Sequence, residues 1–233
     1  MKTLVRMALV AAIAAITIGA GQPRQNWLNT YSTDANGAHV IGNPAASVKL
    51  TEYLSYTCPH CAHFFKESDV ALRVGYIQPG TVSVTISNVI RNPVDMTVAM
   101  LTECGDPRQF FRRHTTFLST QDTWLSRAQD LGQSSMQRWY TGDEPSRMRA
   151  IAADLGLYGV TAQWGVSQSQ ADRCLADPKL RAKIAGQQER ATKAGVESTP
   201  SFSFNGKLEA DVHDWPTVQS ELMKRIKPAM PAT

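Results

Sequence analysis

The chain has 233 residues, of which 42% are hydrophobic and 19% are charged, and its formal net charge is +4. This length is enough for one domain with a full hydrophobic core, so disulfides are not needed merely to fold. The small net charge and the lack of a basic block exclude the usual pattern of a nucleic-acid-binding protein.

The first 21 residues have the pattern of a cleaved secretory signal peptide. Lys2 and Arg6 precede an apolar run from Met7 to Ile18, and small residues follow at positions 19–21. The run is too short and too rich in alanine for a membrane span, although an uncleaved N-terminal anchor is the alternative. A secreted chain enters an oxidising compartment, in which disulfides persist.

The next segments predict a strand, a helix and a second strand. Residues 26–46 are polar and turn-rich, with only the short apolar stretch HVI at 39–41, and we expect them to pack as a leader segment. Residues 47–56 alternate in polarity and are rich in strand formers. Pro59 is suited to the first position of a helix over residues 60–73. A turn at 78–80 then leads to a β-branched strand over 81–90.

A long stretch from residue 93 to residue 195 contains several helical segments, separated by start and stop signals such as Asp177-Pro178. Strand signals return at 201–204, where Asn205-Gly206 is a strong hairpin signal before a second strand at 207–210. Asp214 is suited to cap a last helix that reaches residue 226. The order is therefore βαβ, a helical insertion, then ββα.

The motif Cys58-Pro59-His60-Cys61 lies at the first strand-to-helix turn. A zinc site needs four ligands, and the motif supplies at most three with His60 or His63, so we expect no metal. A purely structural disulfide is the other alternative, but such a small ring is strained and easily reduced. The same property suits a disulfide that is passed to other proteins, so the motif predicts redox chemistry.

Cys58 is the predicted nucleophile. It precedes a helix that begins at Pro59, where unpaired backbone N–H groups and the helix dipole favour a thiolate. A protonated His60 would stabilise it further. A stabilised thiolate stabilises the reduced pair and makes the disulfide a strong electron acceptor. We therefore expect Cys58 to be exposed and reactive, and Cys61, one turn inside the helix, to be the resolving thiol.

The strand before CPHC, the helical stretch after it and the late segment VESTPSF at 196–202 resemble the DsbA family of periplasmic thiol:disulfide oxidoreductases. The resemblance covers nearly all of the chain after the signal peptide. It implies an α/β thioredoxin fold, with residues 22–92 and 196–233 as the thioredoxin domain and 93–195 as an inserted helical domain. It also implies that no cofactor is needed.

The resemblance implies roles for three further residues. In the family, the late proline is cis and the residue before it faces the cysteines; here these are Pro200 and Thr199. A cis X-Pro bond exposes backbone groups that can pair with an extended substrate, whereas a lone Thr-Pro would ordinarily be a trans turn. Glu52 matches an acidic residue that could shuttle the proton of Cys61, although an ordinary strand residue there would face solvent.

Cys104 and Cys174 lie outside the motif. Each is near the predicted C-terminus of a helix, where the dipole disfavours a thiolate, so both are poor nucleophiles. They are either partners in a structural disulfide or two buried free thiols. Some members of the DsbA family, especially from α-proteobacteria, carry a second disulfide in the helical insertion, and the resemblance implies that these two residues form it.

The prediction is thus a periplasmic dithiol oxidase that donates its Cys58–Cys61 disulfide to reduced or unfolded secreted proteins. The resemblance implies re-oxidation by a membrane partner of the DsbB type, and we expect a monomer. Thr199 is more typical of disulfide isomerases, so a reductase or isomerase is the first alternative; the leader is too short for the dimerisation domain of the familiar isomerases. A non-catalytic chaperone is the second alternative. The intact CPHC motif argues against it, because binding alone does not require reactive thiols.

Overall fold

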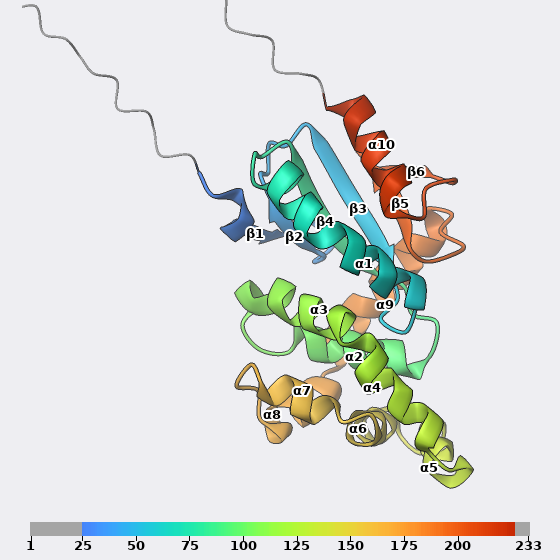
Figure 1. Ribbon diagram of the computed structural model, residues 1–233. Coiled ribbons are helices and arrows are strands. Elements are labelled where there is room, and N and C mark those ends of the chain that lie inside the picture. Colours follow the sequence, from blue (N-terminus) through green and yellow to red (C-terminus); the bar gives the residue numbers. More distant parts are fainter. Residues whose placement is uncertain (1–24, 227–233) are drawn as a thin grey trace, which may run out of the picture.

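The computed structural model describes residues 25–226. A sheet and a layer of helices lie next to each other (Figure 1). Within the described residues six strands form one sheet, in the order β1-β2-β4-β3-β5-β6. The strands are β1 (Tyr31–Thr33), β2 (His39–Gly42), β3 (Val48–Leu54), β4 (Val82–Asn88), β5 (Ser201–Phe204) and β6 (Lys207–Glu209).

The central strands β3 and β4 bring two loops together. They are parallel, with Val48 opposite Val82 and Leu54 opposite Asn88, and all other pairs in the sheet are antiparallel. Their carboxyl ends therefore meet at one edge of the sheet, which is where sheets of this kind usually carry their sites. The CPHC motif follows β3 at this edge, and residues 89–92 follow β4.

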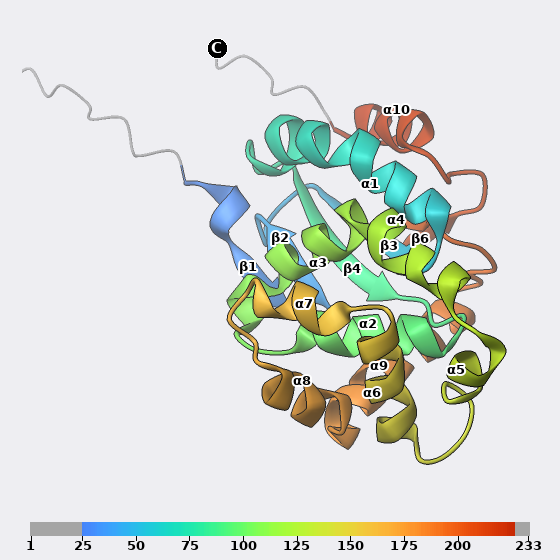
Figure 2. The same cartoon turned by 60° about the horizontal axis from the view of Figure 1, so that its bottom comes forward.

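Helices cover both faces of the sheet. α1 (Pro59–Leu72), which continues into a π-helical turn (Arg73–Ile77), lies with α10 (Trp215–Arg225) on one face. α9 (Pro178–Lys193) contacts β4 on the other face (Figure 2). The ring centroids of Phe64 on α1 and Phe202 on β5 are 4.6 Å apart, and both side chains are buried in the core. These layers confirm the predicted α/β thioredoxin-like fold.

The chain between β4 and α9 forms the helical layer. Its main helices are α2 (Pro93–Glu103), α3 (Phe110–Ser119), α4 (Gln121–Leu125), α5 (Gln133–Gln137), α6 (Glu144–Asp154), α7 (Leu157–Ala162) and α8 (Gln168–Leu175). Asn92, Asp143, Ser167 and Asp177 cap α2, α6, α8 and α9 through their side-chain oxygens. Because α9 contacts both α2 and β4, it joins this layer to the sheet.

The leader segment differs from the prediction. Residues 26–46 contain two strands, β1 and β2, and they extend the sheet. β2 pairs with β4, with Ile41 opposite Val84, and β1 pairs with β2. Strands of three and four residues are too short to show an alternating pattern. Their hydrogen bonds also depend on a partner far along the chain, which local sequence does not reveal.

The other predicted elements are confirmed with small shifts at their ends. The predicted helix over 60–73 corresponds to α1, and the hairpin turn at Asn205-Gly206 has positive φ angles of 52° and 84°. The predicted signal peptide, residues 1–21, lies outside the described residues. Among residues 25–226, no helix is both long enough and apolar enough to cross a membrane.

Candidate active site

The CPHC motif starts helix α1. Pro59 is the first helical residue, and Cys58 is the N-cap, with extended dihedral angles of φ −85° and ψ 117°. The backbone N–H groups of Cys61 and Ala62 donate to the carbonyl oxygen of Cys58 over 3.1 and 3.3 Å, which begins the helical hydrogen-bonding pattern. Cys58 and Cys61 are free thiols in this structure, so it describes the reduced pair.

The two thiols of the motif have opposite acidities. The pKa of Cys58 is lowered to about 5, first by a hydrogen bond from the Cys61 thiol and then by the Thr199 side chain and the backbone N–H groups of Cys61 and His60, against the effect of burial. Burial, together with the neighbouring Cys58, raises the pKa of Cys61 well above its usual value. At neutral pH the pair therefore holds one proton, on Cys61, and Cys58 is a thiolate.

Cys58 is less accessible than the sequence predicts. The residue is 2% exposed, and Cys61 is 0% exposed. The prediction of an exposed nucleophile is wrong because the chain before β5 lies over this sulfur: Cys58 Sγ is 3.2 Å from the carbonyl oxygen of Thr199, to which the protonated thiol donates. Pro59 and His60 are the exposed part of the motif. His60 acts on Cys58 here through its backbone N–H.

Thr199 and Pro200 lie immediately before β5, and the peptide bond between them is cis. Thr199 contacts Cys58 as described, so the structure brings these sequence-predicted residues together. The carbonyl oxygen of Pro200 accepts a hydrogen bond from His213 Nδ1 over 2.8 Å. His213 was not among the predicted residues; it precedes the α10 cap and carries no motif that would have singled it out.

Glu52 is buried rather than facing solvent. It is 6% exposed on β3, and among the described residues its Oε1 atom has no hydrogen-bond partner. It lines a cavity of about 30 Å³ together with Asp69, Arg73 and His114, which is room for about one water molecule. Burial first, and then the charge of Asp69, raises the pKa of Glu52 to about 8.

Glu52 also acts electrostatically on the resolving thiol. Its charge contributes to the raised pKa of Cys61. A carboxyl group with a pKa of about 8 changes protonation near neutral pH, which suits an acid or base in proton transfer. His114 does not share this property, because burial lowers its pKa to about 3 and keeps its ring neutral.

Asp95 fixes the turn before Cys58, and sequence reasoning missed it. The residue is 0% exposed, and its Oδ1 atom accepts hydrogen bonds from the Ser55 hydroxyl and the Thr57 backbone N–H, both over 2.8 Å. Its Oδ2 atom accepts from the backbone N–H of Arg91 over 2.9 Å. One carboxylate thus connects the loop after β3 to the loop after β4. The available signal was Asn92-Pro93-Val94-Asp95, a capped helix start with an acid in its first turn.

Gln121 is a second missed residue. It is 1% exposed at the start of α4, and its Nε2 atom donates to the carbonyl oxygens of Tyr56 and Cys58 over 2.7 and 3.0 Å. A residue of the helical layer therefore holds the backbone of the turn that carries the motif. No local pattern predicts a glutamine in this role, because its partners lie more than 60 residues earlier.

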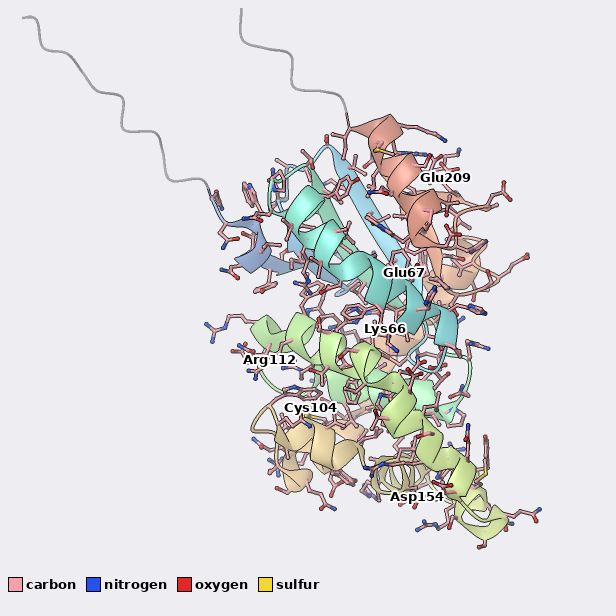
Figure 3. All side chains as sticks on the ribbon, in the orientation of Figure 1. Lys66, Glu67, Cys104, Arg112, Asp154 and Glu209 are labelled. Carbon is pink, nitrogen blue, oxygen red and sulfur yellow. A yellow bond between two sulfur atoms is a disulfide. The ribbon has the colours of Figure 1, made fainter. Side chains whose placement is uncertain are left out.

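Cys104 and Cys174 are joined by a disulfide, with their Cα atoms 5.7 Å apart. Cys104 follows the last residue of α2, and Cys174 lies in the last turn of α8, so the bond joins two helix C-termini. Figure 3 shows Cys104 in the helical layer, away from α1, on which Lys66 and Glu67 are labelled. Within residues 25–226, no group of three or more potential metal ligands gathers.

Comparisons with known proteins agree with this geometry. The family model described as "Thioredoxin" matches residues 34–226. A crystal structure described as a protein-disulfide isomerase from Novosphingobium aromaticivorans is 40% identical, with a TM-score of 0.79, over 82% of this chain and 98% of that one. The α-DsbA1 structure from Wolbachia pipientis has a TM-score of 0.64 at 19% identity, over 81% of this chain and 90% of that one, and shows similarity of fold.

Among curated proteins, one from Rickettsia typhi named as a protein-disulfide oxidoreductase is 28% identical over 179 residues. The match covers 76% of this chain and 57% of that protein. The chain therefore spans little more than half the length of this curated relative.

Proposed function

The chain belongs to the thioredoxin family and has a DsbA-like fold, and we propose that it is a thiol:disulfide oxidoreductase whose net direction is oxidation. The observation that carries the proposal is the opposite acidity of the two thiols at the start of α1. Because the pKa of Cys58 is lowered to about 5 while that of Cys61 is raised, the reduced pair is stabilised. Stabilising the reduced pair makes the disulfide a strong oxidant.

The reaction would proceed by two exchanges. A substrate thiolate attacks Cys58 Sγ of the Cys58–Cys61 disulfide, forms a mixed disulfide and releases the sulfur of Cys61. Cys61 takes up a proton, for which neutral Glu52 is the nearby donor, and Glu52 recovers it from water. A second substrate thiolate then attacks the substrate sulfur of the mixed disulfide. Cys58 leaves as a thiolate, and its low pKa makes it a good leaving group.

Thr199 and Pro200 would hold the substrate at this site. Thr199 lies against the reactive sulfur, and the segment continues into β5, so an extended substrate can align beside it. We assign residues 22–92 and 196–233 to the thioredoxin domain and 93–195 to the helical insertion. The disulfide between Cys104 and Cys174 has a structural role in that insertion.

The same proposal gives a location and partners. The N-terminal sequence pattern and the DsbA-like fold support a secreted protein of the periplasm. Its substrates would be reduced or unfolded secreted proteins, and a membrane protein of the DsbB type would re-oxidise it. We expect it to act as a monomer.

An isomerase is the second candidate, because the 40% identical Novosphingobium structure is described as a protein-disulfide isomerase. Two measurements separate the candidates. An oxidase should have a reduction potential, in equilibrium with glutathione, closer to about −120 mV, the value of DsbA, than to about −180 mV, the value of protein disulfide isomerase. It should also oxidise reduced ribonuclease faster than it rescues scrambled ribonuclease. A lower potential with the reverse ranking of substrates would replace oxidation by isomerisation.

A further inference from the structure

A cavity of about 290 Å³ lies beside the reactive turn, between the loop after β4 and helix α6. Its apolar lining includes two methionines, Met96 and Met148, whose flexible thioethers adapt to ligands of different shape. Met148 is buried and belongs to the core. The remaining lining residues are Ile90, Arg91, Asn92, Pro93, Glu144 and Arg147.

The polar part of this cavity favours an anion. Among the described residues, the buried Nε atom of Arg147 has no hydrogen-bond partner. The one acid in the lining, Glu144, is already ion-paired with Arg181, and Arg91, which is exposed, adds a second cation. A buried donor without an acceptor is costly, so a carboxylate that reached Arg147 would relieve that cost and gain a charge-assisted bond.

The wall of the cavity is connected directly to the reactive motif. Asn92 donates from Nδ2 to the hydroxyl of Thr57 over 2.9 Å, and Thr57 is the residue before Cys58. The Asp95 carboxylate accepts hydrogen bonds from the backbone N–H groups of both Thr57 and Arg91. The loop that lines the cavity and the turn that carries the reactive sulfur are therefore joined by hydrogen bonds.

We propose that this cavity is a side-chain subsite for the substrate polypeptide and that it selects a large apolar residue next to an aspartate or glutamate. The apolar side chain packs on Met96 and Met148, and the carboxylate binds Arg147. The inference rests on the proposed function, because the ligand is the protein whose cysteine reacts with Cys58. It adds a sequence preference that the thiol chemistry alone does not supply.

The test uses the oxidised full chain and a set of dithiol peptides. The peptides are identical except for a Met-Glu, Met-Gln or Ser-Glu pair, placed at several spacings on either side of the reactive cysteine. The rate constant of the first exchange with Cys58 is measured by acid quenching at low salt. We expect the Met-Glu peptide at its best spacing to react about tenfold faster than the Met-Gln peptide, the size of one charge-assisted hydrogen bond.

Variants identify the residue responsible. R147M should lower the rate of the Met-Glu peptide to that of the Met-Gln peptide, whereas R147K should retain most of the preference because it keeps the charge. The matched control is R112M, which removes an exposed arginine on α3 outside the cavity (Figure 3) and should leave the preference intact.

The outcomes separate this inference from the function on which it rests. Equal rates for the Met-Glu and Met-Gln peptides at every spacing, or a full preference in R147M, would overturn the subsite and leave the redox function standing. A loss of preference in R112M as well as R147M would assign the effect to net charge and also overturn the subsite. No exchange with any peptide would overturn both.

Discussion

The Asp95 carboxylate accepts a hydrogen bond from the backbone N–H of Thr57 over 2.8 Å. Asp95 lies 38 positions after Thr57 in the chain, and it fixes the turn that carries Cys58. Replacing Asp95 by alanine would leave the Ser55 hydroxyl and two backbone N–H groups without their acceptor. We expect a loss of about 2–4 kcal/mol in the free energy of unfolding, measured by urea denaturation, and a smaller loss for D95N, which keeps one oxygen.

The control for Asp95 is Asp122, an exposed acid paired with Lys66. D122A should change the free energy of unfolding by less than about 1 kcal/mol, because exposed ion pairs contribute little. If D95A destabilises the protein no more than D122A does, the buried carboxylate does not hold the turn.

The acidity of Cys58 should depend on its partner thiol. A hydrogen bond from Cys61 is the largest cause of the lowered pKa of about 5, so C61A should raise the pKa of Cys58. The pKa is read from the ultraviolet absorbance of the thiolate as a function of pH. C61A should also accumulate mixed disulfides through Cys58, since the resolving thiol is gone. An unchanged midpoint in C61A would contradict the proposed hydrogen bond.

Glu52 should make the protein less stable as the pH rises. Its folded pKa of about 8 lies above its ordinary value of 4.5, so between these values the folded state holds more protons than the unfolded state. Its contribution is fully present below pH 4.5 and is lost as the pH rises through 8, by up to about 5 kcal/mol.

The variant E52Q isolates this contribution. Cys58 has the opposite effect in the reduced protein: its lowered pKa stabilises the fold increasingly from pH 5 towards 9. Both proteins contain Cys58, so its contribution cancels when the free energy of unfolding of E52Q is compared with that of wild type at each pH. E52Q should therefore gain stability relative to wild type between pH 5 and pH 8 in denaturant titrations, and parallel curves would show that Glu52 titrates normally.

The Cys104–Cys174 disulfide should support stability and not the exchange chemistry. It closes a loop of 70 residues, for which chain entropy predicts a stabilisation of about 4 kcal/mol as an upper value. The double variant C104S/C174S should unfold at lower urea concentration and still exchange disulfides through Cys58. Loss of exchange in a variant that remains folded would give this bond a role in the reaction.

Local patterns were sufficient for much of the site. Pro59 after a strand places Cys58 at a helix N-terminus, and the structure has that arrangement because both signals depend only on neighbouring residues. The position of Asp95 beneath Thr57 could not be predicted in the same way. That contact requires β3 and β4 to be parallel neighbours, which is a property of the whole sheet.

The accessibility of Cys58 was predicted wrongly for a similar reason. A helix N-terminus is normally open to solvent, but Thr199 comes from the far end of the chain and covers the sulfur. The strand β2 in the leader segment was not predicted for the same reason, because its hydrogen bonds are made with the distant strand β4. In each case, the residue that decides the outcome is distant in sequence and close in space.

The separation of Cys104 from Cys174 also sets an order of events during synthesis. Synthesis and export both proceed from the N-terminus, so Cys58, Cys61 and then Cys104 emerge while the partner of Cys104 is still 70 residues away. During that interval three thiols are present, and only Cys58 and Cys61 belong together as a pair. The nascent protein therefore passes through a stage in which Cys104 must avoid the very chemistry that the finished molecule performs.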